Sequence, residues 1–101
     1  CAVTAADKDG VIRYMNRRAR ETYRKHGDLV GKSLFDCHGE RAAGIIRRLL
    51  AEGGTNSYTI EKEGVRKMIY QTACTDAGGQ VEGIVEVSMV IPGELPHYIR
   101  N

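Results

Sequence analysis

The sequence predicts an α+β fold, in which an antiparallel sheet has a helical section inserted in its middle. Three observations lead to this prediction. Short segments rich in β-branched and apolar residues lie near both ends of the chain. Residues 40–52 repeat apolar side chains at the 3.6-residue period of a helix. Turn sequences containing Gly and Asp separate the strand-like segments. With 101 residues, the chain has the size of one small domain, so we expect a single core.

The first part of the chain is predicted to hold a hairpin and a helix: strands over residues 2–6 and 11–15, and a helix over residues 17–25. Residues 7–10 (Asp-Lys-Asp-Gly) form the turn of the hairpin, because Asp bonds nearby amides and Gly accepts positive φ. Asn16 is a good N-cap, and Ala19 and Tyr23 form the inward stripe of the helix. Gly27 stands where a left-handed residue ends a helix.

The rest of the chain is predicted to hold a loop with a helical turn over residues 29–35, a helix over residues 40–52, and strands over residues 57–62, 65–74 and 80–91. The apolar stripe of the long helix is Ala42, Ile45, Ile46, Leu49 and Leu50. Gly53 and Gly54 stop the helix, and residues 63–64 and 76–79 are the hairpin turns.

Composition excludes several classes of protein. Hydrophobic residues make up 42% and charged residues 28%, and the net charge is +2, which is ordinary for a globular domain. We find no apolar run of the ~20 residues that a membrane helix needs and predict no membrane partner. Cys1, Cys37 and Cys74 form no Cys-x-x-Cys pair, which favours a reducing cytoplasm. The chain opens on Cys1 without an initiator Met, which favours a fragment or a processed chain.

The segment from Arg13 to Lys25 is strongly basic, with six Arg or Lys in 13 residues. Such a segment is one signal of nucleic-acid binding, but no aromatic platform accompanies it, and Tyr23 belongs to the core stripe. We therefore interpret the charges as a solvated helix face and predict no nucleic-acid partner. Binding that weakens steeply with added salt would favour the alternative.

Three segments in order resemble the PAS family: residues 9–19 (DGVIRYMNRRA), residues 29–34 (LVGKSL) and residues 76–83 (DAGGQVEG). Cys37-His38 and residues 91–100 are similar to a bacterial subgroup of small PAS proteins. The resemblance implies a PAS domain over residues 1–91 with a C-terminal tail over residues 92–101. It implies a five-stranded sheet in the order 2-1-5-4-3, with the helices inserted between strands 2 and 3. It also implies a sensory or protein-interaction role in signal transduction rather than catalysis.

The resemblance places a ligand pocket between the helices and the sheet. In the last strand, every second residue from Val81 to Ile91 is uncharged, so we assign that face to the core and pocket. A shift of one residue would exchange the two faces of every strand. The expected pocket residues are Val30, Leu34, Phe35, His38, Ile46, Leu50, Met68, Tyr70, Val85 and Val87.

The sequence names no cofactor. The Asn-Cys-Arg-Phe-Leu motif of light-sensing flavin PAS domains is absent, and Cys37 reads as a half-buried thiol. Some haem PAS domains carry the axial His on the long helix, but residues 41–50 contain no His. Haem ligation by His38 is an alternative to helix capping or pocket polarity. The scattered His26, His38 and His97 do not predict a metal site.

Enzymatic activity is the competing hypothesis. A small enzyme with the same shell would bind a carboxylate substrate near His38 and use Tyr70 or Cys74 as proton donor. No nucleophile and base can be paired from their spacing, so we predict no catalytic residues. Turnover that is abolished by His38→Ala at an unchanged melting temperature would favour the enzyme.

The predicted outer face of the sheet suggests self-association. Ile69, Ala73, Ile84 and Val90 share the strand face that we assign to solvent, and exposed apolar patches often mark contacts. PAS domains often pair through this face, so we expect a homodimer or a signalling partner. Alternatively, the tail covers the patch within one chain, using Leu95, Tyr98 and Ile99.

Overall fold

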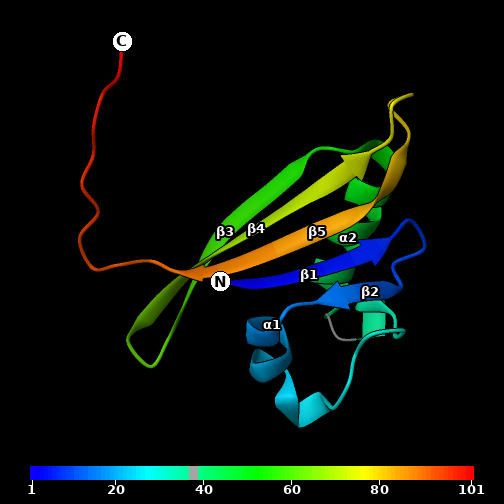
Figure 1. The fold of residues 1–101 in the computed structure, drawn as a ribbon, viewed down its shortest axis with the longest axis horizontal. Helices are drawn as coiled ribbons and strands as arrows, with labels where there is room; N and C mark the ends of the chain where they lie inside the picture. Colours follow the sequence, from blue (N-terminus) through cyan, green and yellow to red (C-terminus); the bar gives the residue numbers. More distant parts are fainter. Residues whose placement is uncertain (37–38) are drawn as a thin grey trace.

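Five strands form one antiparallel sheet in the order β2-β1-β5-β4-β3, and the helical elements lie in the chain between β2 and β3 (Figure 1). The computed structural model describes residues 1–36 and 39–101. The elements are β1 (Ala2–Asp7), β2 (Ile12–Met15), α1 (Arg17–Thr22), the 3-10 helices η1 (Arg24–His26) and η2 (Leu34–Asp36), α2 (Glu40–Glu52), β3 (Thr55–Lys62), β4 (Val65–Thr75) and β5 (Val81–Val90). The predicted fold class, sheet order and place of the helices are confirmed.

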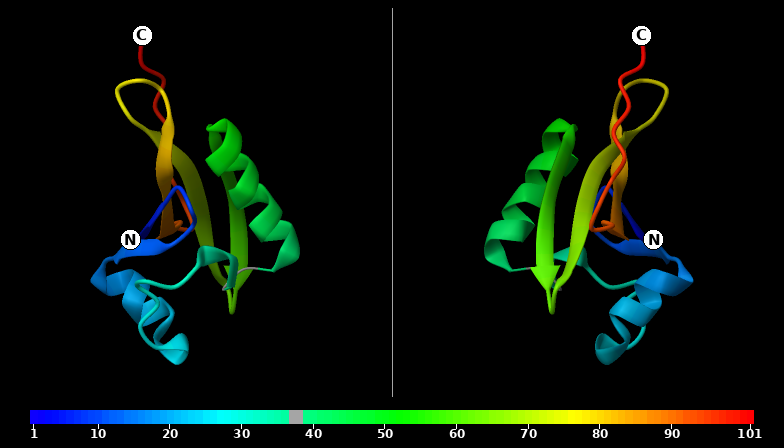
Figure 2. Two further views of the ribbon diagram at one scale, coloured as in Figure 1. Left: turned by 90° about the vertical axis from the view of Figure 1, so that its right-hand side faces the viewer. Right: turned by 90° about the vertical axis from the view of Figure 1, so that its left-hand side faces the viewer.

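The sheet has a helix face, against which α2 packs, and an outer face on its other side (Figure 2). Alternate residues of β1 are buried, as expected for a strand with one covered face. The buried core cluster is Ala2, Ala6, Ile12, Met15, Ala19, Leu29, Leu34, Ile46, Leu49 and Ile84. Burial of one such Ile or Leu side chain contributes about 1.5–3 kcal/mol, so this cluster is the main source of stability.

Strand register decides which residues of β4 and β5 face α2. Ile84 pairs with buried Ala6 of β1, and Gln71 pairs with Glu86. Ile69 and Ile84 are only 6% and 2% exposed, so they belong to the helix face. The expectation that Ile69 and Ile84 form an exposed patch is therefore wrong. The prediction failed because the sequence pattern assigns the face that carries Glu86 to solvent. In the structure this face is covered, and the half-buried Glu86 carboxylate accepts a hydrogen bond from the Gln71 side chain.

Asn16 caps α1 as predicted and also ties the helix to β1. Its Oδ1 accepts the backbone N–H of Ala19 and that of Val3, each at 3.0 Å, and its Nδ2 donates to the carbonyl of Cys1. The helix is shorter than predicted and ends at Thr22, because the backbone turns into the 3-10 helix η1 after Tyr23. Gly27, with φ of 75°, ends this second segment.

The β1–β2 turn is organised by Asp7. Its carboxylate accepts the backbone N–H groups of Asp9 and Val11 and the Arg13 side chain, at 2.8–3.0 Å. Desolvation raises the pKa of Asp7, but the hydrogen bond from Val11 and those from Arg13 and Asp9 outweigh it, so the pKa lies below its ordinary value. Asp76 repeats the device in the β4–β5 turn, where it accepts the N–H groups of Gly78 and Gln80.

Residues 92–101 extend away from the sheet (Figure 1). The side chains of Leu95, Tyr98 and Ile99 are 65–81% exposed, so the tail does not cover the sheet in the way that the sequence suggested as an alternative. Among the helices that the structure describes, none is long and apolar enough to cross a membrane.

Candidate functional site

A cleft lies on the helix face, between the first turns of α2 and strands β3 and β4. It encloses about 540 Å³ and is lined by Gly39, Arg41, Ala42, Ile45, Asn56, Tyr58 and Gln71. Ala42 and Ile45 give it an apolar wall on α2, while β3 and β4 supply two amides and a phenol. An apolar cleft with a few converging polar groups is the usual form of a small-molecule site.

A chain of polar side chains crosses the sheet beside this cleft. Asn56 Nδ2 donates to Gln71 Oε1 at 3.0 Å, and Gln71 Nε2 donates to Glu86 Oε2 at 2.9 Å. The three residues stand opposite one another on β3, β4 and β5, so strand register places them. Gln71 is only 2% exposed, and its hydrogen bonds offset the cost of burying an amide. Because the ionised Glu86 carboxylate can only accept hydrogen bonds, the Gln71 amide must donate to it and accept from Asn56. The Asn56 Oδ1 is then left as an acceptor.

The negative charge of Glu86 affects the ionisation of Tyr58 in the cleft. Desolvation, followed by the negative charge of Glu86, raises the pKa of Tyr58 above its ordinary value. The phenol therefore stays protonated at neutral pH and serves as a hydrogen-bond donor or acceptor. The same charge favours neutral or cationic groups over anions near the strands, while Arg41 contributes the positive charge on the exposed α2 side.

A family profile described as the PAS fold matches residues 1–91. The chain belongs to the PAS family. No curated protein sequence matches the chain.

Solved PAS structures share the fold at low sequence identity. The PAS domain of histidine kinase ThkA is 20% identical, with a TM-score of 0.69 over 86% of this chain and 95% of that one. The Aer2 receptor from Vibrio cholerae, described as a dual PAS-heme oxygen sensor, is 20% identical, with a TM-score of 0.61 over 90% of this chain and 94% of that one. The PAS domain from Bordetella pertussis BvgS is 16% identical, with a TM-score of 0.62 over 90% of this chain and 76% of that one.

Part of the predicted pocket forms the core of this PAS domain. Leu34 and Ile46 are buried in the core cluster, and Val30, Phe35 and Leu50 pack against it. These five residues come together on the helix side, but none of them lines the cleft. His38 lies outside the described residues.

The predicted pocket residues of the strands are on the other side of the sheet. Met68, Tyr70, Val85 and Val87 alternate with the buried Ile69, Gln71 and Ile84, so they lie on the outer face, and none of them lines the cleft. Tyr70 and Cys74 share that outer face, so neither serves the cleft as the proton donor that the enzyme hypothesis requires.

Sequence reasoning missed the polar residues of the site, which are Arg41, Asn56, Tyr58, Gln71 and Glu86. A signal for two of them was present, since Gln71 and Glu86 each interrupt an apolar strand, one on either side of the β4–β5 turn. A polar pair at such positions indicates a cross-strand hydrogen bond on a covered face.

The described cleft residues do not fit a haem. Haem iron is held by His, Cys, Met or Tyr, and of these the cleft contains only Tyr58. Among the side chains that the structure describes, no group of three or more His, Cys, Asp or Glu residues could hold a metal ion.

Proposed function

We propose that this PAS domain is a sensory and interaction module of signal transduction, with the α2 cleft as its ligand site. The observation that carries the proposal is the apolar cleft above the hydrogen-bonded chain Asn56–Gln71–Glu86. The PAS domain of a histidine kinase and the Aer2 oxygen sensor have the same fold, which supports a sensory role. Cys1 and Cys74 are free thiols, which agrees with the cytoplasmic location that we propose.

The ligand that suits the cleft is a small molecule with an apolar body and a neutral or cationic polar end. Ala42 and Ile45 face the apolar body, and the Asn56 and Gln71 amides meet the polar end. The nearby Glu86 carboxylate favours hydrogen-bond donors there. Repulsion from the Glu86 carboxylate weakens the binding of ligands that place a carboxylate close to the strands.

Signal transfer follows from the position of α2. One side of the helix lines the cleft through Ala42 and Ile45, and its buried side packs in the core through Ile46 and Leu49. A ligand that binds one packing of α2 on the sheet more tightly than another shifts the balance between them. The domain then passes that change to attached or partner domains.

Three isosteric probes test the cleft by calorimetry: benzamidine, benzamide and benzoate, which carry positive, zero and negative charge. We expect benzamidine to bind at least about fivefold more tightly than benzoate, because an extra interaction of roughly 1 kcal/mol with Glu86 corresponds to that ratio. In Glu86→Gln, the hydrogen bond from Gln71 can persist while the charge is lost, so the preference should disappear. Equal binding of all three probes, or an unchanged preference in Glu86→Gln, would contradict the proposal.

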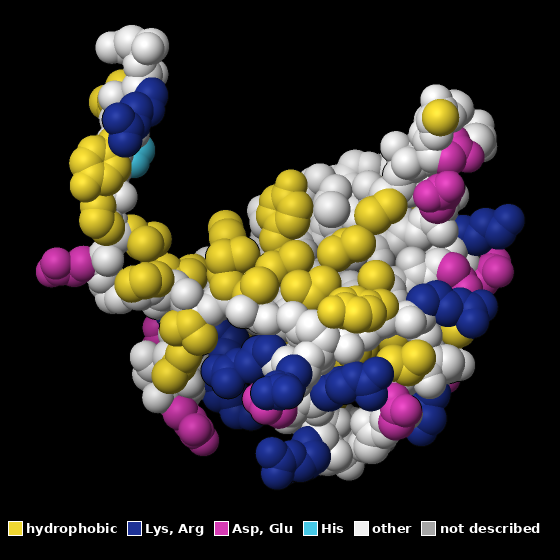
Figure 3. Space-filling model, viewed as in Figure 1, with side chains coloured by type: hydrophobic (Ala, Val, Ile, Leu, Met, Phe, Trp, Pro, Cys, Tyr) yellow, Lys and Arg dark blue, Asp and Glu magenta, His cyan; other side chains and the backbone are white. Residues whose placement is uncertain are grey.

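A second copy of the chain is the partner that we propose for the outer face. Figure 3 shows hydrophobic side chains gathered across the strands on this face. Tyr70 and Met89 are both 40% exposed, and Met68, Val85 and Val87 are half-buried around them. An exposed apolar surface of this kind is typical of a contact, and pairing of two copies is usually two-fold symmetric.

Sedimentation equilibrium tests the pairing. We expect the 101-residue chain to form a dimer and Val87→Lys to be a monomer, because a charge would be buried in the centre of the contact. Lys32→Ala, at an exposed position in the loop before η2, is the control and should remain a dimer. A monomer for the unchanged chain, both whole and ending at Ile91, refutes the dimer.

A further inference from the structure

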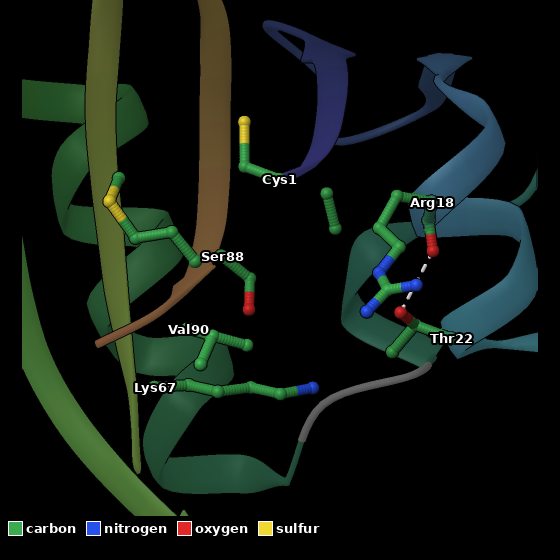
Figure 4. Close-up of a pocket in the computed structure, with 8 residues that line it drawn as sticks. Cys1, Arg18, Thr22, Lys67, Ser88 and Val90 are labelled. Carbon is green, nitrogen blue, oxygen red and sulfur yellow. Dashed lines mark hydrogen bonds between the residues drawn. The ribbon is translucent and has the colours of Figure 1, made fainter. Parts of the chain in front are cut away.

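A second pair of hollows lies away from the α2 cleft, between α1 with η1 and strands β3 to β5. One hollow, of about 460 Å³, is lined by Cys1, Ala2, Arg18, Thr22, Lys67, Ser88, Met89 and Val90 (Figure 4). The other, of about 590 Å³, is lined by Glu21, Thr22, Tyr23, Arg24, Lys25, Ile60, Lys62 and Lys67. They adjoin because both include Thr22 and Lys67, and together we call them the basic groove.

Cations from opposite walls converge on the basic groove. α1 and η1 supply Arg18, Arg24 and Lys25, and the strands supply Lys62 and Lys67. Figure 4 shows the side chains of Arg18 and Lys67 reaching into the hollow from opposite sides. In Figure 3, Lys and Arg side chains gather below the apolar face of the sheet.

These charges are poorly compensated. The single carboxylate of the lining is Glu21, whose Oε2 lies 3.7 Å from Arg18 Nη1 on the same helix. Among the residues that the structure describes, no carboxylate forms an ion pair with Arg24, Lys25, Lys62 or Lys67. Like charges that line a concave surface raise the potential within it and attract counter-ions. An anion that bridges the two walls would relieve this repulsion.

The groove also offers hydrogen-bond donors suited to oxyanions. The Arg18 guanidinium has a fork geometry that matches phosphate or carboxylate oxygens, and the Lys67 ammonium adds a mobile point charge. The Ser88 hydroxyl lies beside them on β5. The concave form and the spread of cations along it suit a small molecule with several charges more than a single monovalent ion.

We propose that the basic groove binds a small polyanion that carries at least two phosphate or carboxylate groups. The ligand spans the walls, with one group between Arg18 and Lys67 and another towards Lys62 and η1. This site is independent of the α2 cleft, whose strand side carries the negative charge of Glu86 and selects the opposite ligand charge. The domain then has two sites of opposite charge preference.

Calorimetric titration with tripolyphosphate and with citrate tests the proposal and distinguishes phosphate from carboxylate ligands. We expect at least one of the two to bind, and we expect Lys67→Gln and Arg18→Gln each to weaken that binding about tenfold, as loss of one charge-assisted contact implies. The matched control is Arg48→Gln, which removes one positive charge from the exposed side of α2 and should leave the affinity within about twofold.

Circular dichroism melting confirms that each variant is folded, and Arg18 is 64% exposed, so its replacement is compatible with folding in any case. The proposal is overturned if neither polyanion binds, or if all three variants weaken binding equally, since net charge alone would then explain it. It is also overturned if Lys67→Gln and Arg18→Gln weaken the binding of a single-stranded RNA oligonucleotide but leave the binding of both anions unchanged, because the basic residues would then serve a nucleic-acid surface.

Discussion

Replacing Gly83 with Ala is expected to destabilise the domain by about 3 kcal/mol, which is the upper range for overpacking in a core. A Cβ atom at Gly83 would collide with the carbonyl oxygen of Ala6. That oxygen belongs to the backbone of β1, where Ala6 pairs with both β2 and β5, so it cannot move away as a flexible side chain would. For a domain of this size, the melting temperature should fall by roughly 15 °C.

Gly44→Ala is the matched control for this variant. Gly44 lies on the exposed side of α2 with open space around the position of a Cβ atom. Because Ala is the better helix former, the control should be stabilised by up to about 1 kcal/mol. A Gly83→Ala protein that melts within 2–3 °C of the unchanged chain would show that the β1–β5 contact is looser than described.

Ile46→Ala is expected to lose about 3 kcal/mol of unfolding free energy in urea denaturation, within the range of large-to-small core substitutions. Ile46 is fully buried in the core cluster with Leu49 and Ile84. Together with Leu49 it packs α2 into the core, so the cavity left by its removal loosens the element that we propose to transmit the signal.

Ile45→Ala is the control, because Ile45 is the adjacent residue of α2 but is half-buried and lines the cleft. We expect it to lose about 1 kcal/mol, in proportion to the smaller apolar area that is removed from water. Ile45→Ala should also weaken benzamidine binding, because Ile45 lines the cleft. Equal destabilisation by both substitutions would contradict the assignment of the two faces of α2.

Local sequence chemistry was sufficient to predict the elements of the fold. The bounds of α2 are those that the periodicity of residues 40–52 predicts, and Asn16 caps α1 through its side chain. Asp7 organises the first hairpin turn as the turn chemistry indicates. The order of the strands came from the resemblance to the PAS family, because no local pattern encodes long-range pairing.

The faces of β4 and β5 could not be predicted from local pattern, because both faces of these strands carry apolar residues. Ile84 and Ile69 lie on the helix face, while Val85 and Val87 lie on the outer face. Glu86, one of the two acids of β5 that led us to assign its face to solvent, is on the covered side, where the Gln71 side chain donates a hydrogen bond to it. An acidic residue in a strand marks the solvent-facing side only where no buried side chain can hydrogen-bond its carboxylate.

The exchange of the two faces of β4 and β5 also explains why the sequence did not predict the polar residues of the cleft. Residues chosen for apolar character, such as Leu34 and Ile46, proved to be core. The polar side of the cleft is instead formed by Asn56 and Gln71. They can form their hydrogen bond because they stand opposite each other on β3 and β4. Only the register reveals that pairing.

The most direct test of the sensory account is a titration of ¹⁵N-labelled chain with benzamidine, followed by two-dimensional NMR. We predict that the largest shifts occur at the amides of Ile45, Asn56 and Gln71 and then extend along α2. This result would place the ligand on the helix face and show that α2 responds to it. Shifts concentrated at the outer-face residues Met68, Tyr70, Val85 and Val87, with α2 unchanged, would contradict the account.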